Sequence, residues 1–223
     1  MGRLFAISDI HGCFKPFYEL VNKTIKLRKS DHLMLLGDYI DRGEDSKAVL
    51  DFIIDLQKSG FNVTPLMGNH EVLLINSWYD PDGLSNWLMN NGISTLNSFR
   101  INDIKQIDSH YLTFITSLEY FKIIGNLIFV HAGFDDQAID PFSEKHSMIW
   151  ECYPNYQNSV FAGKTIIHGH RPKTISHIIK LISGHSAVIP IDSGCVYGRG
   201  SGYGYLSALE LNSMSLYSVP NDY

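Results

Sequence analysis

Three short polar segments near the start of the chain combine residue types that bind metal ions and transfer protons. Each follows an apolar run, and together they carry carboxylates, an amide, imidazoles and a guanidinium. Their sequences are Ser8-Asp9-Ile10-His11-Gly12, Gly37-Asp38-Tyr39-Ile40-Asp41-Arg42-Gly43 and Gly68-Asn69-His70-Glu71. A solvated turn after a buried strand accounts for one such segment, but turns tolerate many sequences. Three coincidences of this kind indicate a functional site.

Two later segments carry histidines in the same way. An apolar run that ends at Val130 leads into His131, and one that ends at Ile167 leads into His168 and His170. Oxygen and imidazole ligands without thiolates suit divalent ions such as Mn²⁺, Fe²⁺ or Zn²⁺ and disfavour a purely structural zinc site. Two such ions about 3.5–4 Å apart activate water for an in-line displacement at phosphorus. We therefore predict a dinuclear centre that hydrolyses phosphoric esters.

The hydrophobic pattern indicates a scaffold that can bring these segments together. Strands are expected at 4–7, 33–36, 63–67, 126–130, 165–167, 187–191 and 206–211, and amphipathic helices at 14–29 and 46–59. Residues 71–118 are expected to be mainly helical with a turn at 80–83, and glycine-rich residues 198–204 to connect the last two strands. This order predicts an α/β layered sandwich with mixed β-sheets flanked by helices. Five of the strands would deliver Asp, Asn or His at their carboxyl ends, where ligands gather in such sheets.

Bulk composition limits the class of protein. A chain of 223 residues, 44% of them hydrophobic, fits a single domain over residues 1–223. The formal charge of -5 gives no basic footprint for a nucleic-acid partner. Three widely spaced cysteines indicate reduced thiols, and no apolar run has the length of a signal-peptide core or a membrane span. We expect a cytoplasmic protein without a nucleic-acid or membrane partner.

Taken together, the polar segments resemble the signature motifs of one branch of the calcineurin-like metallophosphoesterases. This is the phosphoprotein phosphatase (PPP) branch, in its bacterial or phage type. Val130-His131-Ala132-Gly133, His168-Gly169-His170-Arg171-Pro172 and residues 191–198 resemble the later motifs of that branch. The motifs span positions 8–198, which is most of the chain. The resemblance implies a calcineurin-like layered sandwich with a dinuclear metal site at the carboxyl ends of the strands.

The resemblance also implies a role for each motif residue. His70 would protonate the leaving oxygen, Asp41 would orient His70, and Arg42 would bind the phosphoryl oxygens. The nucleophile would be a metal-bound hydroxide, on two divalent ions of which Mn²⁺ is favoured over Fe²⁺ and Zn²⁺. Asp38 would bridge the two ions. The implied metal ligands are Asp9, His11, Asp38, Asn69, His131 and His170.

Some polar residues near the motifs have simpler structural interpretations. Glu71 is expected to cap or pair structurally, His168 to pack behind the site, and Asp192 to orient a loop or a ligand histidine rather than bind metal. Relatives in this branch often carry an arginine shortly after a tryptophan between the last two histidine motifs. Here Trp150 is followed by Glu-Cys-Tyr-Pro, and Arg171 is the candidate replacement.

The motifs leave the substrate open. The leading hypothesis is a phosphoesterase of serine/threonine protein phosphatase type that hydrolyses phosphomonoesters in phosphorylated proteins. The alternative is a bis(5'-nucleosyl)-tetraphosphatase-like hydrolase with a nucleotide-type substrate, because bacterial relatives of that kind share the motifs and the compact size. A third interpretation is a catalytically silent metal-binding protein, against which the complete set of implied ligands argues.

Overall fold

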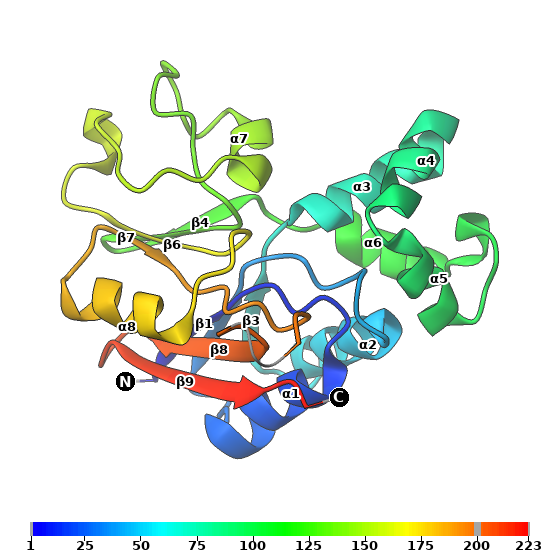
Figure 1. The fold of residues 1–223 in the computed structure, drawn as a ribbon, viewed down its shortest axis with the longest axis horizontal. Helices are drawn as coiled ribbons and strands as arrows, with labels where there is room; N and C mark the ends of the chain where they lie inside the picture. The colour runs from blue at the N-terminus through cyan, green and yellow to red at the C-terminus, as the bar shows by residue number, and fades with distance from the viewer. Residues whose placement is uncertain (1, 199–201, 223) are drawn as a thin grey trace.

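Two β-sheets lie face to face at the centre of the computed structural model, which describes residues 2–198 and 202–222 (Figure 1). The first sheet has the order β3 (Asn62–Pro65), β2 (His32–Leu35), β1 (Leu4–Ile7), β8 (Tyr205–Glu210), β9 (Ser215–Pro220). The second has the order β4 (Phe121–Ile124), β5 (Leu127–Val130), β6 (Thr165–His168), β7 (Val188–Pro190). Strands β1, β2 and β3 pair in parallel, as do β5, β6 and β7, whereas β8 pairs antiparallel with both β1 and β9, and β4 pairs antiparallel with β5. The predicted α/β fold with mixed sheets is confirmed.

Strand periodicity explains why the sheets stack. Successive side chains of a strand point to opposite faces, so one residue in two can enter the space between the sheets. In β1, Ala6 points to the inter-sheet core, and Phe5 and Ile7 point to the outer core. In β5, Phe129 enters the inter-sheet core from the other side, and Ile128 faces outward. Continuous apolar runs therefore form strands that are buried on both faces.

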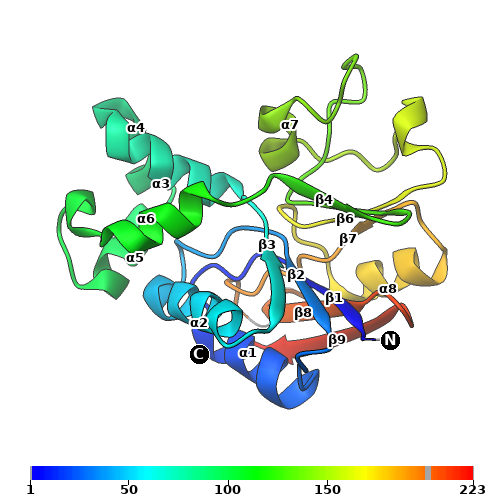
Figure 2. The ribbon, with the colours of Figure 1, turned by 180° about the vertical axis from the view of Figure 1, so that it is seen from behind.

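Helices cover the outer face of the first sheet and extend beyond its β3 edge. The helices that pack on the outer face are α1 (Phe14–Glu19), its π-helical continuation η1 (Leu20–Thr24) and α2 (Ser46–Lys58). A group beyond the β3 edge consists of α3 (Asn69–Tyr79), α4 (Pro81–Met89), α5 (Gly92–Phe99), η2 (Ile104–Gln106) and α6 (Ser109–Thr116) (Figure 2). The second sheet is accompanied by α7 (Lys145–Trp150), η3 (Ser159–Phe161) and α8 (Ile175–Ser183). Among the described residues, no helix combines the length and apolarity that a bilayer crossing requires.

Several element boundaries differ from the sequence prediction. The helix expected to reach residue 29 ends at Thr24. The turn expected at 80–83 is instead the start of α4, because Asp80 caps the helix by accepting from the Asp82 amide and Pro81 occupies the first helical position. The sequence pattern does not predict strands β4 and β9, since most of their side chains are half-buried and show no alternation. Of the predicted connection at 198–204, residues 199–201 lie outside the described part of the chain.

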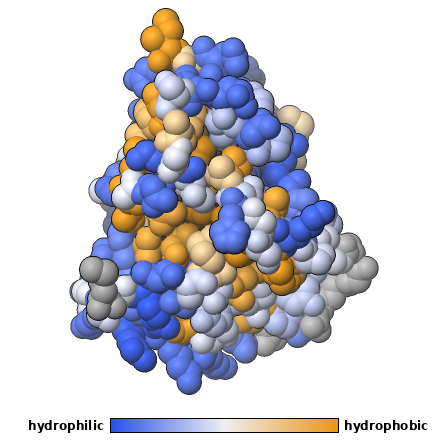
Figure 3. All heavy atoms as spheres, turned by 90° about the vertical axis from the view of Figure 1, so that its left-hand side faces the viewer, coloured by the Kyte–Doolittle hydropathy of each residue, from blue (hydrophilic) through white to orange (hydrophobic). Residues whose placement is uncertain are grey.

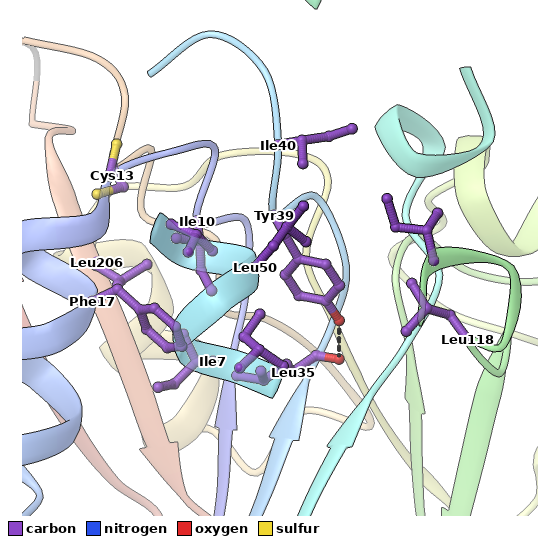
Figure 4. Packing of buried hydrophobic residues seen from close by; sticks show 14 of the residues in the cluster. Ile7, Ile10, Cys13, Phe17, Leu35, Tyr39, Ile40, Leu50, Leu118 and Leu206 are labelled. Atoms are coloured by element: carbon purple, nitrogen blue, oxygen red, sulfur yellow. Dashed lines mark hydrogen bonds between the residues drawn. The ribbon is translucent and has the colours of Figure 1, made fainter. Parts of the chain in front are cut away.

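Tyr39 ties together the ends of β2 and β3 beneath the rim that carries the polar motifs. Its side chain is fully buried, and its hydroxyl hydrogen is shared between the carbonyl oxygens of Leu66 (2.7 Å) and Leu35 (3.1 Å). Figure 4 shows the contact with Leu35. The same hydroxyl accepts from the amide of Gly37 (3.2 Å). The residue next to Asp38 is thus anchored to two strands at once.

We expect the substitution Tyr39→Phe to destabilise the fold by about 1–2 kcal/mol, because the buried Leu66 carbonyl would lose its donor. Urea unfolding of the purified variant measures this loss. Tyr18→Phe is the matched control, since Tyr18 is 45% exposed and its ring contacts survive the change. Equal unfolding midpoints for the two variants would contradict a structural role for the Tyr39 hydroxyl.

Candidate metal centre

The polar motifs meet at the carboxyl ends of parallel strands from both sheets. Asp9 and His11 follow β1, Asp38 follows β2, and His131 follows β5. Asn69 and His70 open α3, shortly after β3, and His170 follows β6. The two sheets stack so that these ends face one another, which is how residues more than 100 positions apart come into contact.

Three of the predicted ligand atoms form a close triangle. Asn69 Oδ1 lies 2.9 Å from His131 Nε2 and 3.0 Å from His170 Nδ1, and the two ring nitrogens are 3.2 Å apart. Ligand atoms about 2.1 Å from one ion lie roughly 3.0–3.4 Å from each other. The triangle therefore has the dimensions of one face of a coordination sphere.

Asp38 lies between this triangle and His11. Its Oδ2 atom is 3.4 Å from His11 Nε2 and 3.5 Å from His131 Nε2, and its Oδ1 atom accepts from the His70 amide (3.0 Å). Two groups of side chains can each hold a cation, His11 with Asp38 and His70, and Asp38 with His131 and His170. Asp38 is common to both, as a bridging ligand requires.

Backbone carbonyls fix the tautomers of two of these histidines. His131 Nδ1 is 2.8 Å from the Leu36 oxygen, and His11 Nδ1 is 3.0 Å from the Ile40 oxygen. Because a carbonyl can only accept, both Nδ1 atoms carry hydrogens, and both Nε2 atoms present lone pairs to the centre. His131 Nε2 and Asn69 Oδ1 are consequently two acceptors in contact, an arrangement that a cation would stabilise.

Burial keeps ligand histidines neutral. Desolvation lowers the pKa of His11 to about 3, and burial together with His131 lowers the pKa of His170 to about 3. Burial alone would raise the pKa of Asp38, but His131, His70 and His11 outweigh it and hold the pKa below its ordinary value. A neutral imidazole and an ionised carboxylate are the forms that bind metal. The donor set therefore fits one or two divalent ions.

Asp9 lies at the edge of this arrangement. Both of its oxygens accept from the His170 amide (3.1 and 2.9 Å), and the Ser8 hydroxyl donates to one of them. It belongs to neither of the two cation-holding groups, in which His70 accompanies His11 and Asp38 instead. The role of Asp9 as a metal ligand stays a prediction.

His70 and Asp41 form a buried hydrogen-bonded pair. His70 Nδ1 donates to Asp41 Oδ2 (2.7 Å), and both side chains are fully buried. His70 Nε2 is buried without a hydrogen-bond partner among the described residues. Burial alone would lower the pKa of His70, but Asp38 and Asp41 outweigh it and raise the pKa. An oriented imidazole with one open nitrogen is the geometry of an acid-base group.

Two residues from helices α4 and α5 hold Asp41 in place, and the sequence predicts a role for neither. Trp87 Nε1 donates to Asp41 Oδ2 (2.8 Å), and Thr95 Oγ1 donates to Asp41 Oδ1 (2.6 Å). A Cβ at Gly92 would collide with the Trp87 ring, so glycine there lets the indole reach the site. A tryptophan and a threonine in an amphipathic helical region look like core residues, and no spacing signal distinguishes them.

Arg42 and Glu71 flank the centre in different ways. Arg42 is exposed, and its Nη1 donates to His11 Nε2 (2.8 Å). Glu71 is buried and accepts from the amides of Asp38 (2.9 Å), Tyr39 (2.8 Å) and Gly68 (3.1 Å). Burial and the Asp38 charge raise the pKa of Glu71 to about 7. The contacts of Glu71 agree with the expected structural role, because it holds the loop that carries Asp38.

His168 and Asp192, for which structural roles are expected, also make contacts with the protein around the centre. His168 is buried, and its Nδ1 donates to the Gly169 oxygen (3.0 Å). Asp192 Oδ1 accepts from the Gly194 amide (2.8 Å), which shapes the loop after β7. Trp150 packs edge-on against His170, with ring centroids 5.8 Å apart. Arg171 is exposed beside His170.

Backbone strain is concentrated at the same rim. Eleven non-glycine residues of the described chain have positive φ, and six of them are predicted site residues. They are Asp9, His11, Asp38, Asp41, Arg42 and His170. Each such conformation costs on the order of 1–3 kcal/mol, and clusters of them occur at functional sites. Strain of this kind agrees with a rim that is shaped for chemistry.

The profile of the calcineurin-like phosphoesterases matches residues 2–207. The chain belongs to this family. The calcineurin-like phosphoesterases use divalent metal ions, in agreement with the two cation-holding groups of this structure. Membership confirms, at the level of the family, the prediction of a phosphoric ester hydrolase.

Curated relatives of this calcineurin-like phosphoesterase carry more specific names. It is 39% identical over 72 residues to a symmetrical bis(5'-nucleosyl)-tetraphosphatase of Buchnera aphidicola subsp. Schizaphis graminum, and 30% identical over 132 residues to one of Nitrosospira multiformis. These alignments cover 32% and 58% of this chain, but 25% and 43% of the relatives. A zinc-dependent endopolyphosphatase of Saccharomyces cerevisiae is 29% identical over 124 residues, which are 52% of this chain and 37% of that protein. The alignments thus span less than half the length of these relatives.

Solved structures with the same fold include enzymes of several names. A protein provisionally described as a diadenosine tetraphosphatase has a TM-score of 0.66 at 22% identity, over 98% of this chain and 93% of its own. A serine/threonine phosphatase of Saccharomyces cerevisiae also reaches 0.66, at 15% identity, over 98% and 79% of the two chains. At these identities the likeness establishes the calcineurin-like fold, as predicted, and nothing finer.

The centre predicts that metal binding stabilises the folded chain. An ion that binds only the folded state at one hundred times its dissociation constant adds about 2.7 kcal/mol. For a chain of this size we expect Mn²⁺ to raise the thermal unfolding midpoint by about 5–10 °C. His131→Ala should remove most of that shift, whereas His110→Ala, at an exposed site, should keep it. An undiminished shift in His131→Ala would contradict this assignment of the centre.

The hydrogen bond from Trp87 predicts a positioning role in catalysis. Trp87→Phe keeps an aromatic ring but removes the N–H that orients Asp41, so we expect kcat for an aryl phosphate with Mn²⁺ to fall about tenfold with KM little changed. Trp78→Phe in α3 is the control, because the Trp78 N–H has no hydrogen-bond partner in the described chain. Equal losses in the two variants, or an effect on KM alone, would argue against this role.

Proposed function

We propose that this phosphoesterase hydrolyses dinucleoside polyphosphates, with cleavage of a dinucleoside tetraphosphate and one water into two nucleoside diphosphates. The observation that carries this proposal is the similarity, at 30% and 39% identity, to relatives named symmetrical bis(5'-nucleosyl)-tetraphosphatases. A centre lined by carboxylate, amide and imidazole donors is chemically suited to such a reaction. The proposal replaces the serine/threonine protein phosphatase hypothesis as the preferred function.

In this proposal Asp9, His11, Asp38, Asn69, His131 and His170 hold two divalent ions. The ions would neutralise phosphate charge and lower the pKa of bound water. Manganese remains the preferred ion, although one relative is named zinc-dependent. The mutual distances of 2.9–3.2 Å between the Asn69, His131 and His170 ligand atoms support an ion position beside Asp38 at these three residues.

The other motif residues act on the substrate in this proposal. Arg42 binds phosphoryl oxygens, since a planar guanidinium can donate to two of them at once. His70 gives a proton from Nε2 to the oxygen of the departing nucleoside diphosphate, and Asp41 keeps the ring oriented during the transfer. The 2.7 Å bond from His70 Nδ1 to Asp41 and the unpartnered Nε2 support these roles.

The phosphoprotein phosphatase alternative rests on the motifs alone. The Saccharomyces cerevisiae serine/threonine phosphatase shares the fold at 15% identity, which carries no information about substrate. A protein substrate therefore has less support than a nucleotide.

A comparison of two substrates tests the proposal. With Mn²⁺, we expect kcat/KM for diadenosine tetraphosphate to exceed that for a phosphoserine peptide at least about tenfold, a difference of about 1.4 kcal/mol in transition-state stabilisation. Chromatography should detect ADP as the sole nucleotide product. The variant Asp38→Asn, prepared identically, controls for contaminating phosphatases. A preference for the phosphopeptide would restore the protein phosphatase hypothesis, and ATP with AMP as products would contradict symmetrical cleavage.

A further inference from the structure

A pocket of about 610 Å³ is lined by the segment after α7, by residues that follow β6 and by helix α8. Arg171, Lys173 and His177 are among its lining residues, together with Tyr153 and Pro154 from the segment after α7. Arg171, the candidate replacement for the arginine that relatives carry, and His168, which packs behind the site, are the lining residues with a role so far.

The lining of the pocket is positively charged, although the chain as a whole is negatively charged. The formal charge of the chain is -5, yet no carboxylate is among the described residues that line the pocket. The side chains of Arg171 and Lys173 make no ion pair with any described residue. Two unpaired cations in a recess favour an anionic ligand, because low-dielectric walls strengthen the attraction.

One of the two cations that line the pocket follows a predicted metal ligand in the sequence. Arg171 directly follows His170, whose Nδ1 lies 3.0 Å from Asn69 Oδ1. Consecutive Cα atoms are about 3.8 Å apart, so Arg171 starts one residue away from the predicted ligands. A second phosphate joined to the reacting phosphoryl group could therefore lie within reach of its guanidinium.

The rest of the lining suits a flat, partly apolar group. Val188 and Pro190 are buried at the end of the second sheet, and Leu181 comes from α8. Tyr153 is 41% exposed, and its hydroxyl donates to Glu151 Oε2 (2.8 Å), which restrains the ring. The molecular face on the side of α8 has apolar side chains in its middle and polar ones around them (Figure 1 and Figure 3). An exposed tyrosine ring such as that of Tyr153 can stack on a nucleobase.

A second recess, of about 390 Å³, is lined in part by Arg42. Its lining includes the carboxylates of Glu44 and Asp45 beside the cations of Lys15 and Arg42. Those carboxylates would repel a chain of phosphates. The pocket at Arg171 is therefore the better candidate for a polyphosphate arm.

We propose that the pocket at Arg171 binds one nucleoside-phosphate arm of the substrate, with Arg171 and Lys173 on the phosphate next to the reacting one and Tyr153 against the base. This inference rests on the proposed function, because it assigns a place to one half of a dinucleoside polyphosphate. It makes these three residues determinants of specificity, separate from the metal ligands.

Equilibrium binding to the full chain loaded with Mn²⁺ tests the pocket without reference to turnover. Isothermal titration would measure Kd for ADP and for inorganic phosphate, a single group that cannot span the metal centre and the pocket at once. We expect ADP to bind at least about tenfold more tightly than phosphate. Arg171→Ala and Lys173→Ala should each remove most of that ratio, whereas Lys180→Ala, an exposed lysine of α8 that does not line the pocket, should keep it.

A second pair of variants tests the base contact. Tyr153→Ala should weaken ADP about fivefold or more and leave pyrophosphate unchanged, because stacking concerns only the base. Tyr153→Phe keeps the ring but not the hydroxyl bond to Glu151, and should lose much less ADP affinity than Tyr153→Ala. Thermal unfolding of each variant verifies that the fold survives.

The outcomes separate this inference from the proposed function. If diadenosine tetraphosphate is hydrolysed but the ADP-to-phosphate ratio is the same in the Arg171, Lys173 and Lys180 variants, the pocket is wrong and the function stands. If diadenosine tetraphosphate is not hydrolysed but ADP binding depends on Arg171 and Lys173, the pocket stands and the function is wrong.

Discussion

The structure depends on one constraint, the burial of several hydrogen-bond acceptors close together at the candidate metal centre. Asp38 is only 2% exposed, and its Oδ2 faces two imidazole nitrogens that carry no hydrogen toward it. Burying such acceptors without donors or a cation is costly. The Leu36 and Ile40 carbonyls accept the Nδ1 hydrogens of His131 and His11, so neither ring donates to the Asp38 carboxylate. Arg42 donates to His11 Nε2, and His131 Nε2 faces two acceptor oxygens.

Holding that arrangement requires support from the backbone. The loop after β2 has positive φ at Asp38, Asp41 and Arg42, and the Glu71 carboxylate binds three amides around it. Gly68 is necessary there, because a Cβ would meet the Asp38 carboxylate and amide. Below the loop, Tyr39 fastens the same segment to two strand ends. A strained rim persists because the layers beneath it fix its position.

The sequence predicts the parts of this design that follow local rules. A polar residue after an apolar run marks a strand end, so the sequence pattern places His131 and the pair His168 and His170 at the same rim as Asp38, and the family resemblance selects His170 as the ligand. The contacts of Trp87 and Thr95 with Asp41 could not be predicted from the sequence. Trp87 lies 46 residues and Thr95 lies 54 residues after Asp41, in a helical segment that carries no motif. Strands β4 and β9 escape prediction because half-buried edge strands lack a clean alternation. Positive φ at six site residues likewise leaves no mark in composition or spacing.

The surroundings of Asp41 explain why this position needs a carboxylate and not its amide. Oδ2 accepts from His70 (2.7 Å) and Trp87 (2.8 Å), and Oδ1 accepts from Thr95 (2.6 Å). An asparagine would direct an N–H₂ group at one or more of these donors, and the His70 ring would then lose the acceptor that selects its tautomer. Because Trp87 and Thr95 belong to the helical segment between β3 and β4, that segment contributes to the orientation of His70 as directly as the strands do. The helical segment is thus part of the site's construction and not only its cover.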